Sequence, residues 1–224
     1  MIDILLLVVV GLVAWLVSGE GAYGAGIVFL SVVLGGLLAM NFFEPLANFL
    51  SAQIPAYATY WDVVSLVGIF AIAVTLLRMG AEQLVPTEIE LHATLYEPLR
   101  WGFAAAAGYV TMAILLTALH TAPLPREFMG FTPERKNLMQ FAAPDRQWLG
   151  LTQYISEKSL SAGRVFDAPI YQAPGTDKSR IWSSFPIRYA TRRERGGGMG
   201  GIPMMPMGGA ASPGGTSVPS SGGL

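Results

Sequence analysis

Residues 2–43 decide the fold, and they read IDILLLVVVGLVAWLVSGEGAYGAGIVFLSVVLGGLLAMNFF. The charged residues of this stretch are Asp3, at its beginning, and Glu20, beside the glycines that divide it in two. A helix needs about 20 residues to cross a hydrocarbon core of about 30 Å, because each residue adds about 1.5 Å. The stretch therefore predicts two membrane-spanning helices, at 2–19 and 24–43, joined by a tight turn.

Two more stretches of the same kind follow at 61–79 and 101–120. Their charged residues lie near the ends, as Arg78 and Arg100 show, and a charge at the centre of a span costs about 2.5 to 3.5 kcal/mol. A water-soluble helical bundle would show a polar face with a period of 3.6 residues, but these stretches are apolar on every side. The sequence predicts an all-α membrane protein whose domain 1–122 contains four transmembrane helices.

The overall composition agrees with this class. The 224 residues are 52% hydrophobic and 13% charged, whereas globular domains carry about 25% charged residues. The chain has no cysteine, which excludes disulfides, thiolate catalysis and cysteine-ligated metals. Because no basic region precedes the first apolar stretch, we expect that helix to remain rather than to be cleaved as a signal peptide.

The composition changes after His120. Residues 123–195 predict a polar region beside the membrane with two short helices, which begin at Thr132-Pro133-Glu134 and Ala143-Pro144-Asp145. In the second helix one face would carry Trp148, Leu151 or Thr152, and Ile155. Residues 196–224 are rich in Gly, Pro, Met and Ser and have no charge, so we expect a disordered tail.

The glycines of the first turn match a nucleotide-binding pattern literally. Residues 19–24 read G-x-G-x-x-G, and Glu44 lies twenty residues beyond. A dinucleotide fold would need a short strand before the glycines and further βαβ units after them, and the flanking segments are long apolar helices instead. We interpret the glycines as a tight turn between two spans.

Other candidate sites have equally simple interpretations. Neither His92 nor His120 is followed, three or four residues later, by a His or carboxylate, so they predict polar residues near helix ends rather than a metal site. The methionines of the tail lack the His or Cys that usually accompanies them at a copper site. We predict no catalytic, metal or cofactor-binding residue.

Small residues within the spans allow helix backbones to approach closely, which is a main source of packing energy in lipid. The candidates for helix packing are Gly35, Gly36, Gly102, Ala106 and Gly108.

The first 120 residues resemble the colicin V production protein (CvpA) family of four-span inner-membrane proteins. The resemblance rests on Asp3, Gly11, Gly21, Gly24 and the segment from Glu97, which continues as Pro-Leu-Arg-Trp-Gly. The chain departs from the family at the first turn, where the family commonly has arginine beside glycine and this chain has Glu20. The resemblance implies a role in envelope function, toxin production or export, without established catalytic residues.

We therefore expect a membrane scaffold or accessory factor whose partners are the lipid bilayer and other membrane proteins or itself, with no nucleic acid and no identifiable small-molecule substrate. The alternative is a passive oligomeric channel or a small-solute transporter. Its pore would be lined by hydroxyl and amide side chains, which are Ser31, Asn41, Ser65, Thr75, Thr111 or Thr117. The basic residues Arg78 and Arg100 flank the loop between the last two spans, so the positive-inside rule places both termini on the extracytoplasmic side of the bacterial inner membrane.

Overall fold

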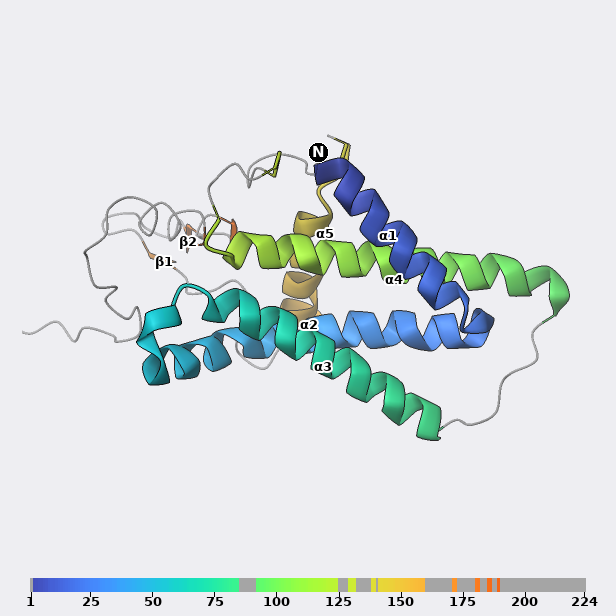
Figure 1. Cartoon of the computed structure of the whole chain (residues 1–224), viewed down its shortest axis with the longest axis horizontal. Coiled ribbons are helices and arrows are strands. Elements are labelled where there is room, and N and C mark those ends of the chain that lie inside the picture. The colour runs from blue at the N-terminus through green and yellow to red at the C-terminus, as the bar shows by residue number, and fades with distance from the viewer. Residues whose placement is uncertain are drawn as a thin grey trace, which may run out of the picture.

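The computed structural model describes residues 2–84, 92–124, 129–131, 138–139, 141–159, 171–172, 180–181, 185–186 and 189. Four long helices form a bundle (Figure 1). They are α1 (Ile2–Ser18), α2 (Gly21–Gln53), α3 (Trp61–Leu84) and α4 (Ala93–Thr121). The shorter elements are a 3-10 turn (Pro55–Tyr57), α5 (Pro144–Tyr154), a π turn (Ile155–Ser159) and the two-residue strands β1 (Tyr171–Gln172) and β2 (Arg180–Ile181), which pair antiparallel.

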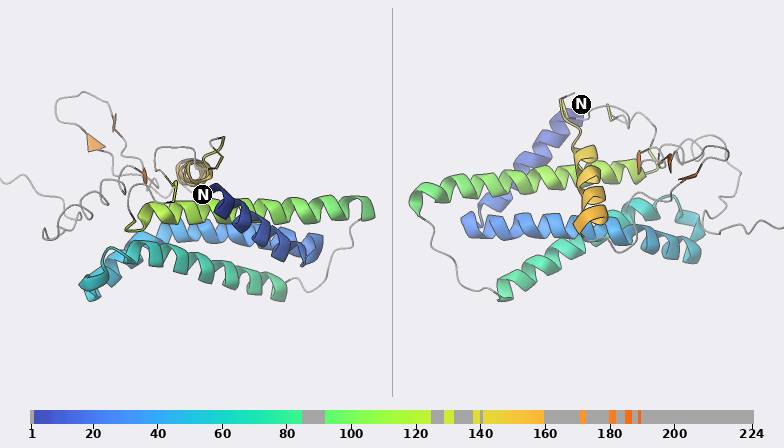
Figure 2. Two further views of the ribbon diagram at one scale, coloured as in Figure 1. Left: turned by 45° about the horizontal axis from the view of Figure 1, so that its top comes forward. Right: turned by 180° about the vertical axis from the view of Figure 1, so that it is seen from behind.

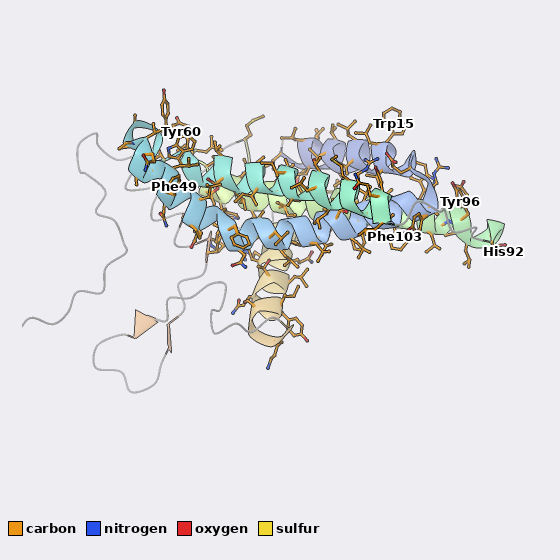
Figure 3. All side chains as sticks on the ribbon, turned by 90° about the horizontal axis from the view of Figure 1, so that it is seen from below. Trp15, Phe49, Tyr60, His92, Tyr96 and Phe103 are labelled. Atoms are coloured by element: carbon orange, nitrogen blue, oxygen red, sulfur yellow. The ribbon has the colours of Figure 1, made fainter. Side chains whose placement is uncertain are left out.

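Helices α2 and α4 form the centre of the bundle. They run side by side in the same direction, α1 packs along α4, and α3 packs along α2 (Figures 1 and 2). Ala25 and Ala39 of α2 and Ala104 and Ala107 of α4 are completely buried, and their small side chains let the two helices approach closely. The outer helices turn apolar side chains away from the protein, as Trp15 shows on α1 (Figure 3).

Three helices are long and apolar enough to cross a membrane: residues Gly21–Gln53, Trp61–Leu84 and Thr94–Thr121. Helix α1 is apolar but has 17 residues, fewer than the about 20 that a span needs when it stands upright. The sequence predicted four spans, and by length and composition the structure supports three. The difference arises because α1 ends at Ser18, where the turn to α2 begins.

Helix α2 is longer than predicted. It has 33 residues and continues past residue 43, through the exposed Pro45, to Gln53. At 1.5 Å per residue α2 is about 50 Å long, more than the about 40–45 Å of a whole bilayer. The helix is therefore longer than an upright span needs.

Helix α4 also begins earlier than predicted, at Ala93 rather than residue 101. Its first turn is capped by His92, whose Nδ1 accepts a hydrogen bond from the Thr94 amide at 3.4 Å. Pro98 lies close enough to this end that few backbone hydrogen bonds are lost. His92 is therefore a helix cap, in agreement with its interpretation as a polar residue near a helix end.

Helix α5 begins as predicted, with Ala143 as its cap and Pro144 in its first turn. It runs across the direction of α2 and α4, on the side of the bundle seen from behind in Figure 2. Its buried face carries Trp148 and Thr152, whereas Leu151 is 40% exposed, which decides between the two predicted faces. The helix predicted at Thr132 and the tail from residue 196 lie outside the described residues.

Candidate functional site

The junction between the bundle and α5 is built on a glycine. Gly36 lies near the middle of α2, and a Cβ added there would stand 2.5 Å from Ile114 Cδ1 and 2.6 Å from Trp148 Cζ2. No side chain fits such a space, so glycine is what lets the Trp148 ring lie against α2. Trp148 is 3% exposed and is the main apolar anchor of α5.

A buried polar contact lies at the same junction. His120, in the last turn of α4, and Asp145, in the first turn of α5, are both 0% exposed, with 2.8 Å between His120 Nε2 and Asp145 Oδ2. The ring of Phe131 lies edge-on to the imidazole at 4.9 Å between centroids. The carboxylate also lies at the N-terminus of α5, where the helix dipole favours negative charge.

The pair is incompletely hydrogen-bonded. Within the described part of the chain, His120 Nδ1, Asp145 Oδ1 and Trp148 Nε1 are buried and have no hydrogen-bond partner. Most buried polar atoms in proteins do have one, so this group of atoms is costly to bury.

The groups around the pair are engaged within their own helix. The neighbouring hydroxyls of Thr117 and Thr121 donate to the carbonyls of Ala113 and Ala118 in their own helix, at 2.9 and 2.8 Å. Among the described residues no group of three His, Cys, Asp or Glu could hold a metal ion. The arrangement supplies a buried, directional link between α4 and α5.

A second polar contact supports the first. The Tyr109 hydroxyl of α4 donates to Gln147 Oε1 of α5. Helix α5 is therefore held to α4 at two positions, by Tyr109 and by His120.

The segment between α4 and α5 is tied to the beginning of α1. The Ile2 amide donates to Met129 O at 3.1 Å, and Asp3 Oδ1 accepts from the Met139 amide at 2.7 Å. Phe131 is 1% exposed and packs in a cluster with Ile2 of α1. Asp3, one of the residues behind the family resemblance, thus lies beside the α4–α5 junction.

Two residues farther along the chain also pack on the bundle. Phe185 is 0% exposed and lies edge-on to Phe43 of α2, with 6.1 Å between the ring centroids. The Tyr189 hydroxyl donates to Glu44 Oε1 at 3.5 Å. The region after α4 is therefore in contact with α1, α2 and α4.

A second polar group lies at the opposite end of the bundle, around the α1–α2 turn. We call this group the charged belt, and it consists of Glu20, Arg78, Glu82, Glu97 and Arg100.

Two arginines organise the charged belt. Arg78 contacts Glu20 and Glu82, each at 2.8 Å. Arg100 Nε donates to the Ser18 carbonyl at 2.7 Å and so satisfies a free carbonyl at the end of α1, and its Nη1 contacts Glu97 at 3.2 Å. Residues from all four long helices or their ends therefore meet at this turn.

Three of the residues on which the CvpA resemblance rests lie at or near the charged belt, and Gly11 does not. Gly21 has a φ of +78°, and a Cβ there would lie 3.0 Å from the Tyr96 hydroxyl, so the tight turn requires glycine at this position. Gly24 lies against the Glu20 side chain, and Glu97 belongs to the charged belt. Gly11 has open space around it.

The small residues predicted to mediate helix packing fall into two groups, those at close contacts between helices and those outside them. A Cβ at Gly35 would stand 2.7 Å from Val74 Cγ2 of α3, and one at Gly108 would stand 2.7 Å from the Val10 carbonyl of α1. Gly102 faces open space and Ala106 is half-buried. Gly35, Gly36 and Gly108 are the three that lie at close helix contacts.

The residues proposed to line a pore do not share one surface. Ser31, Ser65 and Thr117 are buried inside the chain, whereas Asn41 and Thr75 are exposed. The hydroxyls of Thr75 and Thr111 donate to carbonyls four residues earlier in their own helices, each at 2.8 Å.

Sequence reasoning missed the His120–Asp145 pair because it searched for ligand spacings within one helix. The partners are 25 residues apart and belong to different helices. The sequence does contain one signal for the pair: His120 is an ionisable residue at the end of an apolar span, and such a residue normally has a partner. Comparison with models of protein families, with curated proteins and with solved structures found no match to this chain.

Proposed function

We propose that this chain is a four-span membrane scaffold or accessory factor, similar in kind to the CvpA proteins, that acts in envelope function, toxin production or export. The proposal rests mainly on the buried His120–Asp145 contact. A protein whose role is to hold a polar region in a fixed place beside a membrane needs a directional attachment between that region and its spans. The contact has this property.

The charged belt supports α1 as the fourth span. Its contacts bring the end of α1, the beginning of α2, Arg78 of α3 and Arg100 of α4 to one level. Away from the belt, α1 runs beside α4 and contacts Gly108 through Val10. The charged residue at its far end is Asp3. Seventeen residues extend about 25 Å, and charged residues near both ends suit a span in a locally thin membrane.

The belt also suggests the orientation. Arg78 and Arg100 place it on the cytoplasmic side by the positive-inside rule, with both termini and α5 on the extracytoplasmic side of the bacterial inner membrane. A reporter fused after residue 125 tests this arrangement. Activity from a reporter that works only in the cytoplasm contradicts it.

The scaffold role predicts that partners depend on docked α5, whose outward face exposes Leu151 and Tyr154. Affinity capture in mild detergent compares the native chain with Asp145→Ala, which breaks the buried contact. We expect a defined set of membrane proteins with the native chain and at least a fivefold loss with the variant. Arg78→Gln is the matched control, because it removes a half-exposed charge far from α5 and leaves the set unchanged.

A passive pore predicts the opposite pattern. Purified chain in liposomes would then conduct a solute while capture yields no partner. Flux that Thr75→Val or Asn41→Leu abolishes, without partner proteins, rejects the scaffold role.

A further inference from the structure

The segment between α4 and α5 carries an exposed apolar surface. We call it the loop patch; it consists of Met129, Met139 and Phe141, which are 50%, 52% and 87% exposed. A fully solvated loop usually presents polar side chains, so three large apolar side chains in one short segment indicate a partner surface.

The same segment has a second, inward face. Phe131 is 1% exposed and packs with Leu138 against Ile2 of α1. A backbone bridge between Leu138 and Ala142 closes the turn that carries Met139 and Phe141. The segment is thus anchored through one face, and the apolar side chains of the loop patch are its free face.

The backbone holds the loop patch in an unusual conformation. Met129 and Met139 have φ angles of 52° and 47°, in the left-handed region that non-glycine residues seldom adopt. Both residues are hydrogen-bonded to the first turn of α1: the Met129 carbonyl accepts from the Ile2 amide, and the Met139 amide donates to the Asp3 side chain. These bonds fix the level of the loop patch at the beginning of α1.

That level is where an apolar surface of α1 begins. Ile4 and Leu5, directly after Asp3, are 70% and 51% exposed. If α1 spans the membrane, these side chains face lipid and Asp3 lies near the headgroups. The loop patch then continues the lipid-facing surface of α1 at the depth where Phe and Met can reach the acyl chains while the backbone stays among headgroups.

We infer that the loop patch inserts into the boundary between headgroups and acyl chains and holds the α4–α5 junction at the membrane surface. This inference rests on the proposed membrane placement of α1. The partner surface is the lipid interface of the leaflet on the Asp3 side.

The absence of cysteine makes a direct depth measurement simple, because a single introduced cysteine takes a nitroxide label. Phe141→Cys and, as a second site, Met139→Cys are labelled in lipid nanodiscs. The relaxation of each label is then measured with oxygen, which concentrates in the acyl region, and separately with a water-soluble nickel chelate. Lipids labelled on the headgroup or along the acyl chain calibrate the depth.

We expect both labels to lie between the headgroup standard and the upper acyl chain, with oxygen access exceeding nickel access. A label as open to nickel as one free in water overturns the inference. A label shielded from both reagents also overturns it, because protein rather than lipid then covers the patch.

Leu12→Cys separates this result from the proposed membrane placement of α1. Leu12 is 52% exposed and lies within α1. If its label is in lipid and the Phe141 label is in water, the inference alone fails. If the Leu12 label is also in water, the membrane placement of α1 fails with it.

Discussion

The α4–α5 junction and the charged belt hold helices together by opposite means. The belt uses several half-exposed ion pairs, and Arg78 and Glu20 each have side chains that are 39% exposed. The junction depends on His120 and Asp145, both 0% exposed and both with an atom left unpaired. Water can replace a contact in the belt, but it cannot easily replace one in the junction.

The difference should appear in how each region responds to mutation. Exposed ion pairs contribute about 0.2–1 kcal/mol, whereas removing one member of a buried pair costs about 3–5 kcal/mol because the other is left buried and alone. In a chain of this size 1 kcal/mol shifts the melting temperature by about 2–4 °C. Four substitutions, two in each region, test this contrast.

His120→Ala should destabilise the chain most. It leaves the Asp145 carboxylate buried without its partner, and we expect a loss of about 3 kcal/mol, or a fall in the melting temperature of about 6–12 °C. Intrinsic tryptophan fluorescence during heating in detergent measures it. His120→Leu combined with Asp145→Leu is the control, because replacing both members removes the burial cost and should restore most of the loss. A fall of less than 2 °C for the single variant contradicts the importance of the junction.

Gly36→Ala should cost about 1–3 kcal/mol, because the added methyl group overlaps both Ile114 and Trp148. Gly102→Ala is the matched control, since nothing lies within 4 Å of its Cβ and alanine favours the helix. Limited proteolysis reports release of α5 directly. Equal cleavage of the two variants would show that Trp148 does not depend on Gly36.

Gly21→Ala tests the turn at the charged belt. A φ of +78° costs alanine about 1–2 kcal/mol, and the methyl group approaches the Tyr96 hydroxyl. We expect the melting temperature to fall by about 2–8 °C with α5 still protected from protease. Gly68→Ala, in open space on α3, should show no fall. Release of α5 by Gly21→Ala would mean that the two ends are coupled.

Arg78→Gln should have the smallest effect, below about 1 kcal/mol, because its ion pairs are half-exposed. The difference from the native chain should shrink further as salt rises, since exposed charges are screened. Melting at low and high salt checks this, with Arg78→Lys as the variant that keeps the charge. A shift as large as that of His120→Ala would remove the contrast between the two regions.

The sequence predicts the helices well and their ends poorly. Long apolar runs mark the cores of all four long helices, because the cost of a charge in lipid leaves a clear pattern. The predicted spans stop at residue 43 and begin at residue 101, whereas α2 continues through Pro45 and α4 begins before Pro98, because exposure or a nearby terminus lowers the cost of a missing hydrogen bond. Composition alone cannot show this local compensation.

The candidate site shows the same limit more strongly. The turn at Gly21 follows from short-range spacing, and so does the beginning of α5 at Pro144. The His120–Asp145 pair follows only from how α5 lies across the bundle, and this is set by the space at Gly36 in a third helix. A contact that depends on the arrangement of three helices produces no periodic pattern in the sequence of any one helix, so it cannot be predicted from such patterns.

The space at Gly36 also has a consequence for biosynthesis. The seat of Trp148 is formed by α2 and α4 together, since Gly36 and Ile114 both border it. Residue 148 leaves the ribosome after both helices, and it can find its seat only when they have already paired. Docking of α5 therefore follows the pairing of α2 and α4, so an exposed Trp148 would mark chains in which these two helices failed to associate.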